Sequence, residues 1–152
     1  MKKKLFILSS FLLIIISVGC SDEKQLYDWQ SETDKTIASD PNSIIGTWEL
    51  KTLCYPEGNH EIPIEDRDLF MFSSNGQVKV LIKKGRPLYP DLPNEDGEYD
   101  YSYDKEKQII QLCGETLKCI ISNGEMSIEG DHYGPDDGLY FHKFQFIKKS
   151  KY

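Results

Sequence analysis

The sequence is short of basic residues. Its 152 residues include 18 Lys and Arg against 25 Asp and Glu, which gives a formal net charge of −7. Apart from the lysines among the first four residues, the basic side chains form no cluster. A phosphate backbone would be repelled by such a chain, which argues against nucleic acid as a partner. The acidic residues are spread out, and their ordinary role is a solubilising surface.

Motifs of catalysis and metal binding are also missing. The sequence contains no Gly-x-Ser-x-Gly, no glycine-rich phosphate loop, no His-Glu-x-x-His and no Cys-x-x-Cys. The acidic stretch "DHYGPDDG" (131–138) could offer oxygen ligands to calcium, but its spacing is not that of an EF-hand loop. The three histidines lie on separate segments: His60, His132 and His142. We therefore expect neither an enzyme nor a resident metal or cofactor.

The sequence has no apolar run of the length usual for a membrane span. The longest, from Leu5 to Ile16, is interrupted only by two serines and falls short of the roughly 20 residues that a helix needs to cross a bilayer. Three lysines precede this run and small residues follow it. This layout is typical of an export signal.

The end of this segment carries a resemblance. Ser17-Val18-Gly19-Cys20 resembles the lipobox of bacterial lipoproteins, although that family usually has Leu where this chain has Ser17. The resemblance implies a signal peptide over 1–19 and a mature chain that begins at Cys20, acylated with chains such as palmitate that anchor it to a membrane. Ser21-Asp22-Glu23 is similar to the signal that sends some such lipoproteins to the outer face of the outer membrane. We expect a lipid-anchored outer-membrane protein, with surface exposure as one arrangement; an ordinary signal peptide with an incidental cysteine is the alternative.

Residues 21–42 are polar and lack periodicity. We expect them to form a tether, so that lipidated Cys20 and the tether together occupy 20–43. Leu26, Tyr27 and Trp29 are too few to form a core but could lie against the folded domain. Asp40 to Ser43 could begin a single helical turn.

From Ile45 onward the apolar residues alternate with polar ones, and turn residues separate the runs. Asn75-Gly76 and Asn123-Gly124 are strong hairpin signals. Eight strands are predicted, at 44–54, 69–74, 78–84, 98–104, 108–113, 116–121, 125–129 and 139–149. We expect an all-β domain over 44–152, an eight-stranded antiparallel up-and-down barrel, since closure leaves no open edge. A two-sheet sandwich is the main rival, but most connections are too short for it.

Gly46-Thr47-Trp48 on the first strand matches the Gly-x-Trp motif of the lipocalin superfamily, and the chain from 44 to 149 resembles a lipocalin-like domain in outline. The resemblance implies a barrel that binds a small ligand. It also implies a basic residue near the last strand that packs on the tryptophan, for which Lys148 or Lys149 could serve.

The lengths of the connections predict where the site lies. In an up-and-down barrel alternate connections share one rim, and three long ones (55–66, 85–97 and 130–138) fall on the same rim, together with a short turn at Gly114-Glu115. The other rim has only tight turns, and the tether leaves from it. Since long loops commonly carry function, we expect the site at the long-loop rim, facing away from the membrane.

Side chains expected to point into the barrel are rich in large aromatics, which crowd a lumen of eight strands. The inward set is Trp48, Leu50, Phe70, Phe72, Val78, Val80, Ile82, Tyr99, Tyr101, Tyr103, Ile110, Leu112, Leu117, Met126, Ile128, Tyr140, Phe144 and Phe146. The candidate ligand-binding residues are a tyrosine wall near the open end with loop residues above it: Tyr99, Tyr101, Tyr103, Tyr140, Tyr89, Arg86, His132 and Tyr133. Leu88, Tyr89 and Leu92 are either presented outward or folded down as a lid.

Three cysteines remain beyond Cys20, and strand phasing puts Cys54 and Cys119 inward and Cys113 outward. One disulfide plus a free thiol, or three separate thiols, both fit. Two functions also remain open. In the first, the membrane-anchored barrel binds a small amphipathic or aromatic ligand at its open end. In the second, a filled barrel docks a cell-envelope protein as an accessory subunit or inhibitor, through an exposed patch of Leu88, Tyr89 and Leu92.

Overall fold

The computed structural model describes residue 29 and residues 31–83, 88, 89, 91–133 and 139–149, without the side chains of 32, 33, 131–133 and 139–141. Its elements follow one another as α2 (Glu32–Ile37), β1 (Gly46–Tyr55), β2 (Gly58–Glu61), the 3-10 helix η1 (Ile64–Asp66), β3 (Leu69–Phe72), β4 (Gln77–Leu81), β5 (Gly97–Asp104), β6 (Ile109–Leu112), β7 (Glu115–Ser122), β8 (Glu125–Tyr133) and β9 (Leu139–Lys148).

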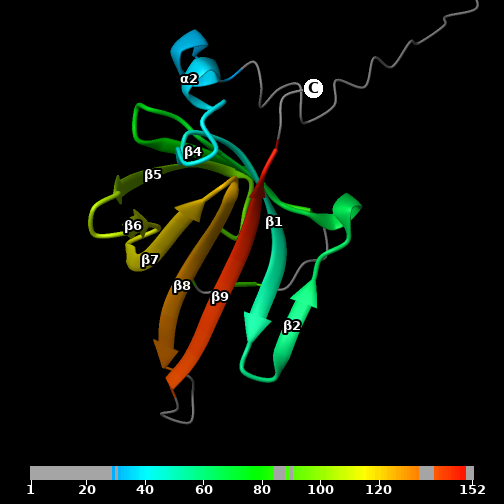
Figure 1. Cartoon of the computed structure of the whole chain (residues 1–152). Coiled ribbons are helices and arrows are strands. Elements are labelled where there is room, and N and C mark those ends of the chain that lie inside the picture. The colour runs from blue at the N-terminus through cyan, green and yellow to red at the C-terminus, as the bar shows by residue number, and fades with distance from the viewer. Residues whose placement is uncertain (1–28, 30, 84–87, 90, 134–138, 150–152) are drawn as a thin grey trace, which may run out of the picture.

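The predicted barrel is confirmed. Strands β1 and β3 to β9 pair antiparallel with their neighbours in chain order, and β9 pairs with β1 to close the cylinder. β2 is an additional strand that the sequence did not predict, because its four residues are all exposed and carry no alternation. β2 forms a hairpin with the C-terminal half of β1 (Thr52 to Tyr55), whereas β3 pairs with the N-terminal half of β1 (Figure 1).

A β-bulge in β1 corrects one prediction. The β1–β9 register shifts between Leu50 and Thr52, so one extra residue of β1 interrupts the alternation. After the bulge Leu53 joins the core and Tyr55 packs against it, while Cys54 lies opposite Lys143 outside the core cluster. The prediction that Cys54 points inward is therefore wrong, because strict alternation was carried across the bulge.

Side chains from all eight barrel strands pack into one core cluster. The inward set predicted above is confirmed apart from Tyr140, whose side chain lies outside the described part. Trp48, Phe70, Phe72 and Val80 are fully buried, and Ile82, Tyr99, Tyr101 and Tyr103 pack against the cluster with part of their surface exposed. The middle of the barrel is thus occupied by its own side chains.

The predicted long connections begin and end at one rim, but β8 continues to Tyr133, so the prediction that 130–133 belong to a connection is wrong. One rim, which we call the mouth, contains the segments 56–68 and 113–114, the described residues between β4 and β5 (82, 83, 88, 89 and 91–96) and the facing ends of β8 and β9. The turns 73–76, 105–108 and 123–124 lie at the opposite rim, the closed end. The β6–β7 turn is centred on Cys113-Gly114, one residue earlier than predicted, with positive φ at both residues.

The segment before the barrel is not the featureless tether that was predicted. It contains α2, which lies over the closed end (Figure 1). Ser31 caps this helix by accepting a hydrogen bond from Asp34 N at 3.1 Å. The Asp34 carboxylate accepts hydrogen bonds from Ser73 Oγ at 2.6 Å and Ser74 N at 3.1 Å on the β3–β4 turn. A helix of six residues is unstable alone, so these contacts to the barrel stabilise it.

The rest of the segment also contacts the closed end. Trp29 packs against Leu69 and Met71 on the outside of β3. Asn42 accepts a hydrogen bond from Asn123 N, and Pro41 O accepts one from Gly124 N. Residues 31–43 therefore belong structurally with the barrel that was predicted to begin at 44, and residues 40–43 form a turn rather than a helix start.

Lys148 closes the same end from the last strand. Its ammonium lies 5.1 Å from the centre of the Trp48 ring and donates to Asp40 O at 2.6 Å and Ser43 O at 2.7 Å. Gly46 permits this approach, because its φ is +127° and a Cβ there would lie 3.0 Å from Lys148 Cε. The basic residue expected on the tryptophan is therefore Lys148.

The stability contributed by Lys148 should depend on pH. Burial lowers the pKa of Lys148 from 10.5 to about 8, against the opposing effect of the Asp40 charge. Between these values the unfolded chain binds more protons than the folded chain, so the Lys148 contribution to stability rises with pH. Lys148 is partly exposed, which reduces the effect. We therefore expect the difference in free energy of unfolding between the wild type and Lys148→Met to rise by about 1–2 kcal/mol in favour of the wild type from pH 7.5 to 9.5. Urea unfolding of both proteins measures this, and a constant difference would contradict it.

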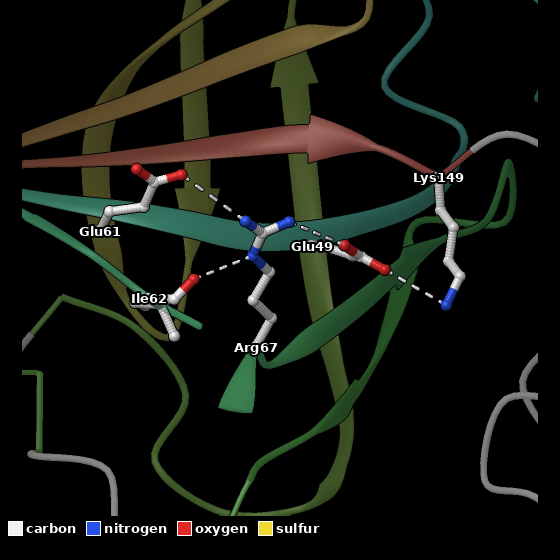
Figure 2. Close-up of polar contacts among 5 residues, drawn as sticks. All are labelled: Glu49, Glu61, Ile62, Arg67 and Lys149. Atoms are coloured by element: carbon white, nitrogen blue, oxygen red, sulfur yellow. Dashed lines mark hydrogen bonds and ion pairs between the residues drawn. The ribbon is translucent and has the colours of Figure 1, made fainter. Parts of the chain in front are cut away.

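The β2–β3 connection is held on the outer wall by charges (Figure 2). Arg67 donates to Ile62 O at 3.2 Å and to Glu49 Oε2 at 3.3 Å, and it lies 3.9 Å from Glu61 Oε1. Glu49 also pairs with Lys149 Nζ at 3.2 Å. These groups satisfy one another, so this network supports the wall rather than offering a binding site.

Candidate functional site

The mouth of the barrel is covered by part of the β4–β5 connection. Tyr89 and Leu92 insert into the core cluster and are 4% and 2% exposed, whereas Leu88 is 78% exposed. The Tyr89 ring meets Phe144 edge-on with centroids 5.5 Å apart. Asn94 fixes the Tyr89 backbone, since its side chain accepts from Tyr89 N at 2.8 Å and donates to Tyr89 O at 2.7 Å. Of the two predicted arrangements, Tyr89 and Leu92 therefore form a lid and only Leu88 is presented outward.

A buried carboxylate and an imidazole face each other beneath this lid. Asp91, between Tyr89 and Leu92, is 4% exposed, and its Oδ2 lies 3.8 Å from His142 Nδ1 on β9. This separation exceeds a hydrogen bond. Neither atom has a hydrogen-bond partner among the described residues. Buried polar atoms without partners are uncommon in native proteins and call for an explanation, such as a ligand or water.

Gly130 makes room for the Asp91 carboxylate. Gly130 is paired with His142 across the β8–β9 ladder. A Cβ added at Gly130 would lie 2.9 Å from Asp91 Oδ2 and 2.9 Å from Leu117 Cδ2, closer than real Cβ atoms approach other heavy atoms. We call the space formed by Gly130, Leu117 and His142 the cradle. Its shape accepts a carboxylate because the residue at 130 has no side chain.

Aromatic rings surround the cradle. Tyr55, which the β1 bulge turns inward, meets His142 edge-on at 5.8 Å between ring centroids, and Phe144 lies 6.4 Å from His142. Burial raises the pKa of the Tyr55 hydroxyl, so this group stays neutral and can donate a hydrogen bond. The mouth thus combines apolar ring surface with a few polar atoms, the usual composition of a small-molecule site.

The predicted tyrosine wall does not gather at one point. Tyr99 lies near the mouth and donates to Glu95 O at 2.8 Å. Tyr101 instead donates to Ser73 O at 2.8 Å at the closed end, and burial raises its pKa strongly. Tyr103 packs against the core two residues further along β5, and burial raises its pKa also. The structure brings Tyr89 and Tyr99 to the mouth and separates Tyr101 and Tyr103 from it.

Other predicted site residues lie outside the described part, wholly or in their side chains. Cys20 and Arg86 are not described. His132, Tyr133 and Tyr140 have described backbone at the mouth ends of β8 and β9, but their side chains are not described. The prediction missed Asp91, His142, Gly130 and Tyr55 as site residues. Asp91 gave one usable signal, a charged residue between two apolar ones in a proline-rich loop.

The cysteines and acidic groups give no second site. Cys54, Cys113 and Cys119 are all free thiols, so the alternative with a disulfide is wrong. Burial raises the pKa of all three thiols, that of Cys119 to about 12, which keeps them protonated and weakly nucleophilic. In the described part of the chain, no three His, Cys, Asp or Glu side chains are grouped to hold a metal ion. The helices described there are too short or too polar to cross a bilayer.

Comparisons with protein-family models, with curated proteins and with solved structures found no match to this chain. The closed eight-stranded barrel, the Gly46-Thr47-Trp48 motif on β1 and the packing of Lys148 on Trp48 are consistent with a lipocalin-like fold.

Proposed function

We propose that this protein is a lipid-anchored, lipocalin-like protein of the outer membrane that binds one small amphipathic or aromatic ligand at the mouth of its barrel. The observation that carries the proposal is the pair of buried polar atoms, Asp91 Oδ2 on the lid and His142 Nδ1 on β9, which face each other with no hydrogen-bond partner among the described residues. A ligand that replaces Tyr89 and Leu92 would bury its apolar part against Phe144 and Tyr55. Its polar group would reach His142.

For the alternative function, docking of an envelope protein on a filled barrel, one observation is favourable and one is unfavourable. The core cluster fills the middle of the barrel, as that alternative expects. However, two of the three residues of its proposed patch, Tyr89 and Leu92, are buried, which leaves Leu88 as an isolated exposed leucine. Single exposed apolar residues are common on protein surfaces and do not mark an interface. The mouth therefore remains the better candidate.

The proposed lipid anchor and the orientation of the barrel at the membrane rest on the lipobox resemblance at Cys20 and on the docking of residues 31–43 at the closed end. If Cys20 carries the lipid, eight residues (21–28) join it to Trp29, which packs on the barrel, and span at most about 29 Å when fully extended. The closed end would then lie near the membrane and the mouth would face away from it. The role is binding rather than catalysis.

Native mass spectrometry of the full-length protein, purified from its host membranes, tests the proposal. We compare the wild type with Leu92→Ala, which removes a lid side chain from the mouth, and with Leu88→Ala, which changes the exposed leucine of the same loop. We expect a bound small molecule on the wild type, at higher occupancy on Leu92→Ala because an apolar void at the mouth favours an apolar ligand. Leu88→Ala should not change the occupancy.

Two results would overturn the proposal in favour of the docking function. One is the absence of a bound small molecule from all three proteins. The other is a co-purifying envelope protein that Leu88→Ala releases and Leu92→Ala retains. The intact mass of the same samples also shows whether Cys20 carries acyl chains.

A further inference from the structure

We infer that the ligand of the mouth is a carboxylate with a compact apolar body, and that the lid residues Tyr89, Asp91 and Leu92 occupy its place in the unliganded protein. This inference rests on the proposed function and names the chemical class of its ligand. In the structure the lid presents an aromatic ring, an aliphatic side chain and a carboxylate to the mouth. These are the parts that such a ligand would bring.

The cradle is built for a carboxylate. Asp91 places its carboxylate against Gly130, where a Cβ would be 2.9 Å away, so any side chain at 130 would expel it. His142 is the group with donor capacity that lies against Asp91 Oδ2, with its Nδ1 at 3.8 Å. Lys118 and Lys143 both pair with Glu129, which alternation along β8 places on the opposite face from Gly130, away from the cradle. The imidazole is therefore the group that would recognise the anion.

The lid carboxylate fits this cradle only loosely. At 3.8 Å from His142 Nδ1, Asp91 Oδ2 is about 1 Å too far for a charge-assisted hydrogen bond, and both atoms stay without partners among the described residues. Asp91 is restrained by the chain on both sides, where Asn94 holds Tyr89 in place. A free carboxylate is not restrained in this way and can move into bonding distance. The ligand thus gains a hydrogen bond that the lid does not make.

A matched pair of small probes tests this inference. Cinnamate carries an aromatic ring and a carboxylate, and cinnamamide has nearly the same shape without the charge. Each is titrated into uniformly nitrogen-15-labelled full-length protein and followed by amide NMR. We expect cinnamate to shift the resonances of Gly130, His142 and Leu92 and to bind about tenfold more tightly than cinnamamide, as a hydrogen bond to a charged group implies.

Variants identify the groups responsible. His142→Phe keeps an aromatic ring and should weaken cinnamate binding about tenfold while leaving cinnamamide binding unchanged. Asp91→Asn removes the competing charge of the lid at almost constant volume and should tighten cinnamate binding several-fold. Tyr101→Phe, which removes a hydroxyl from the closed end, is the control and should change neither affinity.

The outcomes separate this inference from the proposed function. Equal affinity for the two probes at the mouth, unaffected by His142→Phe, would overturn the carboxylate assignment while the ligand site remained. Cinnamate shifts confined to residues away from the mouth, in the wild type and in Asp91→Asn alike, would overturn it too. The proposed function itself is tested separately, by the native mass spectra of the wild type.

Discussion

Replacing Asp34 with alanine should lower the free energy of unfolding by about 2–4 kcal/mol at neutral pH. Asp34 is 1% exposed, and its carboxylate is the acceptor for Ser73 Oγ and Ser74 N. Hydrogen bonds to a charged acceptor contribute about 1.5–3 kcal/mol each, and their loss leaves the hydroxyl of buried Ser73 without this acceptor. Because α2 is too short to be stable alone, we expect the helix to detach. Urea unfolding measures the loss, and circular dichroism reports the helix.

The same variant carries a pH signature. Burial raises the pKa of Asp34, but hydrogen bonds from Ser73, Ser74 and Ser31 outweigh it, so the pKa in the folded state is lower than the ordinary value of 3.8. A lowered carboxyl pKa gives stability that is present above the unfolded value and is lost as pH falls through the folded value. The difference between wild type and Asp34→Ala should therefore shrink below about pH 4.

Asp104 provides the control for Asp34. It is the last residue of β5 at the same closed end and also accepts a hydrogen bond, from Lys107 N at 3.0 Å, but its side chain is 42% exposed. Asp104→Ala should cost much less stability and leave the helix signal intact. Equal losses for the two variants would mean that α2 does not depend on its contact with the β3–β4 turn.

The barrel itself was predictable because its signals are local. Period-two alternation and the turn residues at Asn75-Gly76 and Asn123-Gly124 act over a few neighbouring positions, and chain order then determines the neighbours of each strand. The rim that carries the long connections follows from counting them. These inferences need no contact between distant residues, so one sequence is enough for them.

The errors arose where tertiary contacts decide the local structure. The bulge in β1 reverses which side chains of Leu53, Cys54 and Tyr55 point into the barrel, and nothing in "LKTLCY" shows the bulge. Helix α2 has a polar sequence, and its only local sign was Ser31 three residues before Asp34, the spacing of an N-terminal cap. The cap forms, and the Asp34 carboxylate also bonds Ser73 and Ser74 on the barrel, which the sequence does not indicate. Both features depend on neighbours that the sequence does not identify.

The candidate site was the least predictable part. Asp91 and His142 are far apart in the chain and meet only because the β4–β5 connection folds over the mouth. Gly130 has its role only in relation to these two residues. The tyrosines of β5 gave a stronger sequence pattern, but that pattern reports a barrel wall that runs from the mouth to the closed end, and so it does not locate a site.

Trp48 should be the most sensitive residue of the closed end. Its side chain is fully buried, and its Nε1 donates to Ile44 O at 2.7 Å beneath the Lys148 ammonium. Trp48→Ala should cost about 3–5 kcal/mol through the cavity that it leaves. Trp48→Phe keeps a ring but leaves Ile44 O buried without its donor, so we expect a loss of about 2–3 kcal/mol.

A double-mutant cycle with Lys148→Met isolates the contact between the ammonium and the ring. We expect a coupling of about 0.5–1 kcal/mol between Trp48→Phe and Lys148→Met, as for a cation above an aromatic face. Trp29→Phe is the control, since Trp29 lies outside the barrel against Leu69 and Met71 and should cost less than Trp48→Phe. Because these variants remove tryptophans and so change the fluorescence signal itself, unfolding is followed by far-ultraviolet circular dichroism. If Trp29→Phe costs as much as Trp48→Phe, the closed end does not depend on the tryptophan of the Gly-x-Trp motif.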